Sequence, residues 1–470
     1  MGTAAKWMLC FRRLTKPAFG ICCRFMRQLY YAVAVPRFTY AANIWYAPVT
    51  HAVPDARASG SVGATKRLES IQHMAVTAIT GTLRTMAMDI MEAHANVLPV
   101  ELLMHRVCHR AAVRLASLPD THPLHKPVLA CACRQEKCHL SPIHLLLQAY
   151  KIKPAEFKAF SLANRPPNIK CVLTTDIAAT RDSSKVADLE DDAALKVYTD
   201  GSGQDGMASA TAVLYKGDAV TKTLKYQLGS LEWHTTYEVE LVGLLLGLWL
   251  IRQEPEAGSA SIKADSQAAI LALCAHRTGL GSYLLDKIRE LSASLRAQSL
   301  MDLQIKISWV SGHDGVARNE RADIEAKAAA AGSSSDKPEL PPLLHSPLPI
   351  SVTTARQHFR ATLTVDWRNH WRKSPHFWHA SKIDPRLPDA SFLRLTKEIS
   401  KTQASTIVQL RSEHTLLRKY LFRIGKLDSP VCALCHHGAE SVHHFLFEYP
   451  MHQHARFDLS HALGRQSKSL

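Results

Sequence analysis

The chain has 470 residues, of which 46% are hydrophobic and 21% charged, so it can form several packed domains. A formal net charge of +16 favours polyanionic partners, nucleic acid before an anionic membrane. Eleven cysteines, an odd number in so long a chain, do not resemble the disulfide framework of a small secreted protein. The composition therefore indicates an intracellular protein in a reducing compartment.

The sequence predicts neither a signal peptide nor a membrane span. Arg12, Arg13 and Lys16 interrupt the apolar residues near the N-terminus, where a signal peptide needs a continuous apolar core. The most apolar later run, residues 241–251, is much shorter than the roughly 20 residues that cross a bilayer. We therefore expect no membrane contact.

The chain divides into three structured regions and two linkers. Residues 1–150 carry apolar stripes at helical spacing and are expected to be helical. Residues 151–192 end in an acidic, serine-bearing run and are interpreted as a linker. Residues 332–349 are rich in serine and proline, which also indicates a linker. Residues 350–470 are expected to be a helical tail.

The central region, residues 193–331, has a different pattern. Its expected order is three strands, a helix, a strand, two helices, a strand and a helix, which predicts an α/β layer sandwich with a mixed five-stranded sheet. The first strand is expected to end at Asp200, with Gly201 and Ser202 turning the chain away. The long apolar segment 235–254 is expected to be a well-buried helix.

Four carboxylates of this region are placed where they can meet. Asp200 and Asp265 end two predicted strands, and Glu240 and Asp323 lie in the first turns of two predicted helices. Sites in open α/β sheets form beyond the carboxyl ends of the strands, so the four acids can converge on one edge. Four carboxylates in one place repel one another unless cations neutralise them. Hard oxygen ligands favour two Mg²⁺ or Mn²⁺ ions.

Four segments of the region carry a resemblance to a known family. They are YTDGSG at 198–203, TTYEVELVG at 235–243, KADSQAA at 263–269 and WVSGHDGVARNERADIEAK at 309–327. In this order they resemble the motif series of type 1 ribonucleases H. The resemblance implies that Asp200, Glu240, Asp265 and Asp323 bind the metals, and that His313 moves a proton at the leaving group.

The resemblance implies a hydrolase, an endonuclease that cuts the RNA strand of RNA–DNA hybrids by two-metal chemistry. The alternative is a catalytically inactive relic that binds nucleic acid. The complete set of four acids and His313 argue against this alternative. A transposase or integrase of the same architecture is disfavoured by the GHDGVARNERAD segment. Two positions depart from the family pattern: Ser311 replaces its usual proline and is expected to loosen the loop, and Arg318 replaces its usual glycine and brings a cation near the metals.

Two segments of the N-terminal region, residues 27–48 and 68–106, carry a second resemblance. They resemble the part of non-LTR retrotransposon polyproteins, especially fungal ones, that follows the reverse-transcriptase core. The single Asp-Asp pair of the chain, Asp191-Asp192, lies in a polar segment, so we expect no polymerase activity. Basic flanks are expected to contact nucleic-acid backbone, with Arg27, Lys66, Arg67 and Arg84 as candidates; a solvated basic face is the alternative. A nuclear stage is implied by the resemblance alone.

Two Cys/His clusters contain residue types that bind zinc. The spacing of Cys131, Cys133 and Cys138, with His139 and His144, does not fit common structural zinc sites. In the tail, Cys432, Cys435 and His444 resemble the Cys-Cys-His-Cys element near the end of retrotransposon proteins, with Tyr449 where the family expects a cysteine. Two interpretations stay open for the tail: a weak Zn²⁺ site, or a remnant that binds no metal.

Overall fold

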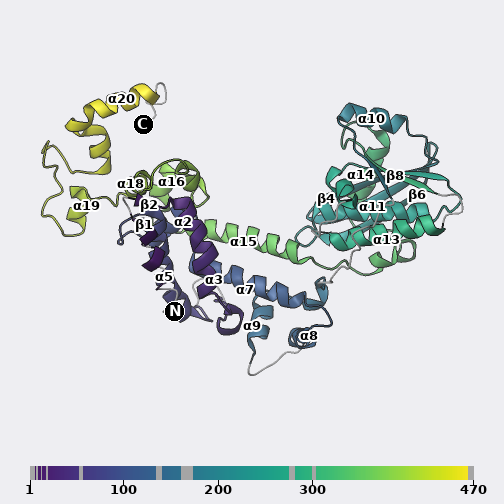
Figure 1. Cartoon of the computed structure of the whole chain (residues 1–470), viewed down its shortest axis with the longest axis horizontal. Helices are drawn as coiled ribbons and strands as arrows, with labels where there is room; N and C mark the ends of the chain where they lie inside the picture. The colour runs from purple at the N-terminus through teal and green to yellow at the C-terminus, as the bar shows by residue number, and fades with distance from the viewer. Residues whose placement is uncertain are drawn as a thin grey trace. The chain divides into compact units, whose positions relative to one another are not determined.

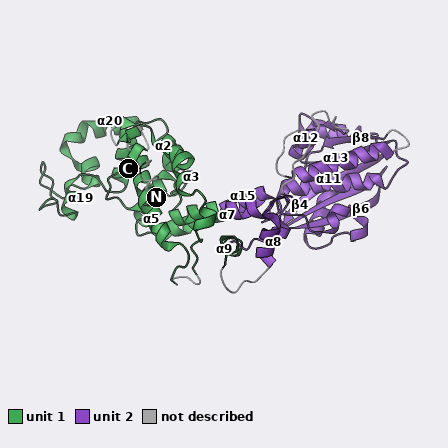
Figure 2. Cartoon of the chain, turned by 60° about the horizontal axis from the view of Figure 1, so that its bottom comes forward, with its two compact units in different colours: residues 1–109, 140–149, 361–470 green, residues 110–139, 150–360 purple. Residues whose placement is uncertain are grey.

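The structure, a computed structural model, describes residues 6, 9–11, 13–16, 19–51, 57–133, 140–159, 173–274, 281–298 and 303–463. The chain forms two compact units, which are coloured separately in Figure 2. Unit 1 comprises residues 1–109, 140–149 and 361–470, and unit 2 comprises residues 110–139 and 150–360.

Unit 1 is mainly helical, as predicted for both flanks of the chain. It combines the N-terminal region with the tail, although the two are far apart in the sequence. The helices of these flanks are α2 (Cys23–Leu29), α3 (Val35–Phe38), α4 (Ala42–Trp45), α5 (Val62–Thr80), α6 (Met88–Ala95), α7 (Val100–Ala116), α9 (Pro142–Ala149), α15 (Val352–Arg372), α16 (Phe377–Ile383), α17 (Ser391–Leu395), α18 (Lys401–Arg411), α19 (Arg418–Arg423) and α20 (Gln453–Leu463).

A buried lysine joins the two halves of unit 1. The ammonium group of Lys401, at the start of α18, donates to the carbonyl oxygens of Ala78 and Ile79 at the end of α5. Terminal helix carbonyls have no partner within the helix, and the helix dipole favours a cation there. Ser405, one turn further along α18, donates to the carbonyl oxygen of Gly81. The tail therefore completes hydrogen bonding that the N-terminal region leaves open.

Unit 2 contains the predicted α/β layer sandwich (Figure 1). The strands lie in the order β3-β8-β7-β4-β5-β6, with β3, β8, β7 and β4 parallel and the β4-β5-β6 meander antiparallel. The sheet and its helices are β3 (Thr174–Asp176), α10 (Arg181–Leu189), β4 (Leu195–Gln204), β5 (Met207–Lys216), β6 (Ala219–Ser230), α11 (Thr236–Arg252), β7 (Ser259–Ala264), α12 (Gln267–Cys274), α13 (Ser282–Gln298), β8 (Gln304–Trp309) and α14 (Ala317–Ala330).

The core of this sheet follows the alternation of its strands. Val197 of β4 belongs to the large apolar core with α11, α12 and α13, and the next residue, Tyr198, packs with Ala322 of α14 on the opposite face. Helix α11 lies close to β4 because Gly243 and Gly247 face it; a Cβ at Gly247 would lie 3.2 Å from Thr199. This close packing fixes α11 against the strand that carries Asp200.

The prediction of five strands was wrong by one, because the expected linker 151–192 contributes a strand and a helix. Strand β3 pairs with β8 at the edge of the sheet, over only three residues. Helix α10 follows it and begins with a capping box, in which Thr180 and Ser183 satisfy each other's backbone N–H groups. The acidic, serine-rich composition indicated a linker because it has few apolar residues, yet it supplies caps and charges that fix a helix.

The segment 332–349 is also no free linker. Leu340, Leu344 and Leu348 are buried in the core of the sheet domain. Ser335 forms two hydrogen bonds with the backbone of Lys225 on the edge strand β6. The N–H of Ser335 donates to the carbonyl oxygen of Lys225, and the N–H of Lys225 donates to the hydroxyl of Ser335. An exposed edge strand offers unpaired N–H and C=O groups to other chains. The segment therefore covers this edge and extends the core.

We expect Leu344→Ala to destabilise the sheet domain by about 2–5 kcal/mol, because it leaves a cavity under a buried leucine. Hydrogen exchange of β6 and α11 amides in the full chain should accelerate. The matched control is Leu343→Ala, since Leu343 is only partly buried and should cost less. Exchange in Leu344→Ala as slow as in the wild type would show that the segment does not support the domain.

Candidate active site

Strand β4 carries Asp200 at the point where its parallel neighbour ends. The pairing of β4 with β7 stops at Thr199, whereas its pairing with β5 continues through Asp200 to Gln204. The turn predicted at Gly201 is therefore wrong. The hairpin turns instead at Asp205-Gly206, both with positive φ, as in the Asp-Gly turns that match the twist of a hairpin.

Helix α11 presents two neighbouring glutamates with different surroundings. Glu238 closes a capping box: its carboxylate accepts from the backbone N–H of Thr235 at 3.0 Å, and the side chain is fully buried. Glu240 lies beside Asp200 and Asp265, and ligand oxygens of the three residues all lie within 4.8 Å of one another. The structure thus brings together three of the four predicted carboxylates and gives Glu238 a capping role.

Two glycines make this approach possible. A Cβ at Gly201 would lie 2.7 Å from a carboxylate oxygen of Glu240, and one at Gly312 would lie 2.6 Å from Asp265. Distances this short do not occur for real side chains, so any larger residue would displace a carboxylate. Neither glycine was predicted to have this role, because the contacts join segments that are distant in sequence.

Asp323, the fourth predicted carboxylate, lies next to the group and is paired with a lysine. Its Oδ2 accepts from Lys327 at 2.6 Å, one turn further along α14, and this pairing raises the pKa of Lys327. The charge of Asp323 also raises the pKa of Asp200, so the two carboxyl groups lie close to each other. Asp323 can therefore join the other three once a cation replaces its lysine partner.

Burial and mutual repulsion set the electrostatics of the group. Burial, followed by the charges of Asp265 and Asp323, raises the pKa of Asp200 to about 8. Burial and the charges of Asp265 and Asp200 raise the pKa of Glu240 well above its usual range. Burial also raises the pKa of Asp265, against the opposing influence of His313. A site that disfavours its own ionisation in this way is suited to bind cations.

His313 lies in the loop between β8 and α14 and is exposed. Its backbone is left-handed, with φ of 53°, and Gly315 also has positive φ. The base of the loop is tied to Asp265: the indole of Trp309 donates to the carbonyl oxygen of Asp265 at 2.9 Å. The predicted histidine therefore lies beside the carboxylates, within electrostatic reach of Asp265.

The two departures from the family pattern have other consequences than expected. Arg318 was expected near the metals, but its guanidinium binds Asp218 and stacks over Tyr215. Ser311 was expected to loosen the loop, but its buried hydroxyl is hydrogen-bonded to Asp314. Both side chains are engaged in local contacts.

The tail brings its three predicted metal ligands together. Ligand atoms of Cys432, Cys435 and His444 lie within 4.8 Å of one another. Backbone N–H groups of Cys435 and Leu434 are the main cause that lowers the pKa of the Cys432 thiol to about 7. The other ring nitrogen of His444 lies 2.8 Å from a carboxylate oxygen of Glu448, a contact that orients the ring.

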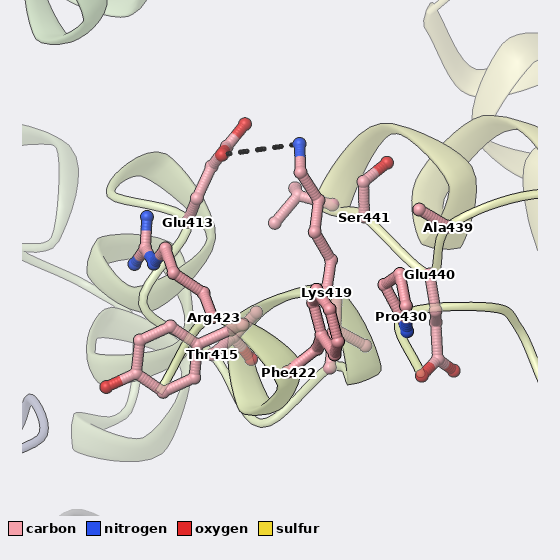
Figure 3. A pocket seen from close by; sticks show the side chains of 12 residues that line it. Glu413, Thr415, Lys419, Phe422, Arg423, Pro430, Ala439, Glu440 and Ser441 are labelled. Carbon is pink, nitrogen blue, oxygen red and sulfur yellow. Dashed lines mark ion pairs between the residues drawn. The ribbon is translucent and has the colours of Figure 1, made fainter. Parts of the chain in front are cut away.

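A cavity of about 380 Å³ lies in the tail. Figure 3 shows its lining, with α19 side chains on one side and residues 439–441 on the other. Lys419 points across it towards Glu413, 4.0 Å away. None of the predicted catalytic or metal-binding residues lines this cavity.

The remaining candidates are dispersed. The guanidinium of Arg27 donates to the backbone and side chain of Asn96. The contact of Arg27 with nucleic-acid backbone stays a prediction. Lys66, Arg67 and Arg84 are exposed. Cys131 and Cys133 lie on α8 (His125–Cys133), and Cys138 and His139 lie outside the described residues. His144 is hydrogen-bonded to Ser141.

The sheet order, the helices on its two faces and the carboxylates at the β4 and β7 ends define a ribonuclease H-like fold. Comparison with protein families agrees: the RNase H family profile matches residues 192–331. The chain therefore contains a ribonuclease H domain. A comparison with curated proteins found no match.

Solved structures similar to the chain are ribonucleases H. The N-terminal RNase H domain of Rv2228c from Mycobacterium tuberculosis, solved as a maltose-binding-protein fusion, is 23% identical, covering 29% of this chain and 98% of that one, with a TM-score of 0.23. RNase H1 of Halobacterium salinarum is 21% identical, covering 30% and 98%, with a TM-score of 0.24. LC11-RNase H1, solved with an RNA/DNA hybrid, is 14% identical, covering 29% and 96%, with a TM-score of 0.24.

None of the helices in the described ranges combines the length and the apolar character needed to span a membrane.

The raised pKa of Asp200 predicts a pH-dependent stability of the metal-free protein. A carboxyl with a pKa near 4 unfolded and about 8 folded stabilises the fold fully below about pH 4, and this contribution is lost as pH rises through 8. We expect Asp200→Asn to raise the melting temperature in EDTA at pH 8.5. The melting temperatures at pH 8.5 and pH 5 should therefore differ less in this variant than in the wild type. The exposed Asp205→Asn is the control. If Asp200→Asn has the same dependence of melting temperature on pH as the wild type, the carboxylates do not repel one another as inferred.

Proposed function

We propose that the domain hydrolyses the RNA strand of RNA–DNA hybrids with the help of two Mg²⁺ or Mn²⁺ ions. The observation that carries the proposal is the group of Asp200, Glu240 and Asp265, with Asp323 alongside. Its raised pKa values mean that divalent cations would relieve a repulsion built into the fold.

The residues present fit such ions. All four side chains offer hard oxygen ligands, which Mg²⁺ and Mn²⁺ prefer over other groups. Asp200, Glu240, Asp265 and Asp323 would hold the ions. Bound ions of this kind activate water and stabilise the leaving oxygen in phosphodiester hydrolysis. The protein's own part is to fix the carboxylates through the close approaches at Gly201 and Gly312.

His313 would hold and deliver a proton at the leaving group. Imidazole side chains can serve as general acids and bases in catalysis. Its exposed position on a loop beside Asp265 lets the ring reach a substrate that lies over the carboxylates. The hybrid would be selected through the 2′-hydroxyls of its RNA strand, with little base preference, since sugar and phosphate contacts carry no base code.

The resemblance of the flanks supports a wider context. We propose that the chain derives from a retrotransposon polyprotein whose nuclease removed RNA after DNA synthesis. The exposed Lys66, Arg67 and Arg84 and the net charge of +16 favour contact with nucleic-acid backbone. The alternative is an inactive relic that binds nucleic acid but does not cut it, and an assay of cleavage distinguishes the two.

We expect the full chain to cut a labelled RNA–DNA hybrid in Mg²⁺, and Asp265→Asn to lose at least about 10²-fold in rate, as when other charge-stabilising groups are removed. EDTA should abolish cleavage. Asp205→Asn removes a carboxylate from the exposed β4-β5 turn and should leave the rate unchanged. Absence of a cut product from the wild type, or equal rates for wild type and Asp265→Asn, would favour the relic.

We further infer that the tail cluster binds one Zn²⁺. Two thiols and one imidazole are a zinc donor set, and thiolate ligands are favoured by amide N–H groups directed at the sulfur. Metal analysis of the full chain purified without chelators should give about one zinc per chain. Cys435→Ser should lower this content, whereas Cys133→Ser, at an exposed helix position, should not. A zinc-free wild type would favour the metal-free remnant.

A further inference from the structure

The loop that carries His313 adopts a backbone that needs support. His313 has φ of 53°, in the left-handed region that side chains other than glycine disfavour. Gly312 lies against the carboxylate of Asp265, so the loop has little freedom to move towards β7 without a clash. The placement of the histidine therefore depends on contacts that hold the loop from its other side.

Three contacts hold the loop, and one of them comes from outside the matched domain. Ser311 is hydrogen-bonded to Asp314, and the N–H of Gly315 donates to Glu320 at 3.1 Å. The third is an ion pair between Lys185 of α10 and Asp314, with Nζ and Oδ2 3.0 Å apart. Lys185 is the first cause that lowers the pKa of Asp314, the residue next to His313. The RNase H profile begins only at residue 192.

Helix α10 is itself fixed to the strands of the active site. Asp188 accepts a hydrogen bond from the hydroxyl of Tyr198 at 2.8 Å. Asp191, just after the helix, pairs with the buried Lys263 at 2.6 Å. Tyr198 and Lys263 each lie two residues before an acid of the carboxylate group, on β4 and β7 respectively. The helix that holds the loop is therefore anchored to the same two strands that present Asp200 and Asp265.

We propose that Lys185 is a positioning residue for His313, holding the loop 311–315 through Asp314 so that the imidazole stays over the carboxylates. This rests on the proposed nuclease function. Helix α10 precedes the matched residues 192–331 and would thereby help to place His313. Arg181 also lies within electrostatic reach of Asp314, on the same helix, so charge reversal at residue 185 is a more severe test than removal.

The test compares Lys185→Ala, Lys185→Glu and Lys185→Arg in the full chain, with and without His313→Ala. We expect kcat to fall about three- to fivefold in Lys185→Ala, the range of a half-exposed ion pair, and further in Lys185→Glu. KM should change less than twofold, and Lys185→Arg should keep the wild-type rate. In the His313→Ala background the Lys185 variants should have no further effect.

The matched control is Lys222→Ala. Lys222, on β6, forms an ion pair with Glu339, and this pair is about as exposed as the pair of Lys185 with Asp314. The control variant removes the same charge from the domain and should leave kcat unchanged. An equal loss in Lys222→Ala and Lys185→Ala, or a loss that persists in the His313→Ala background, would overturn the proposal.

A second measurement does not require activity. With ¹³C-labelled histidine, the imidazole signal of His313 can be identified by its loss in His313→Ala. We expect this signal to shift or broaden in Lys185→Glu and to stay unchanged in Lys222→Ala. If the wild type cuts no hybrid, the proposed function fails while this signal still tests the positioning role. An unchanged signal in Lys185→Glu would overturn the role whether or not the wild type is active.

Discussion

Repulsion among carboxylates at one edge of a sheet is the constraint on which the domain is built. Asp200, Glu240 and Asp265 are held within a few ångströms of one another, and each has a raised pKa. Such an arrangement costs folding energy when the groups are ionised and no cation is present. The carboxylates stay close together because the surrounding packing holds them there. Gly243 and Gly247 let α11 pack closely on β4, and Gly201 leaves room for Glu240. The packing of the core therefore supports a chemically strained edge.

The main elements of the domain could be predicted because their signals are local. Alternation in β5, the apolar length of α11 and the capping residues before Glu238 all lie within short segments. The site residues followed from motif order and from the rule that strand ends share an edge. The close approaches at Gly201 and Gly312 could not be predicted, because they join residues that meet only in the folded chain.

The segments interpreted as linkers show where composition misleads. Residues 174–189 contain few large apolar residues, yet they form β3 and α10. Their stability comes from the helix cap and from Asp188, which pairs with the buried Lys263. Residues 332–349 contain several prolines, but three leucines among them complete the core. Serine and proline content could not reveal the contacts of these two segments, because their partners lie on the distant strands β4, β6 and β7. In the tail, by contrast, the spacing of Cys432 and Cys435 already indicated which residues converge.

The interleaved order of the two units bears on how the chain folds during synthesis. Unit 2 is nearly continuous in sequence, whereas unit 1 is assembled from residues 1–109, a short central piece and residues 361–470. The carbonyl groups at the end of α5 meet Lys401 only after the whole ribonuclease H domain has left the ribosome. At about 5–20 residues per second, the roughly 320 residues between the end of α5 and Lys401 take roughly 15–65 s to synthesise, and the N-terminal helices wait that long for these partners. During that interval the surfaces that pack against the tail are open to chaperones, and the ribonuclease H domain can reach its native state before unit 1 does.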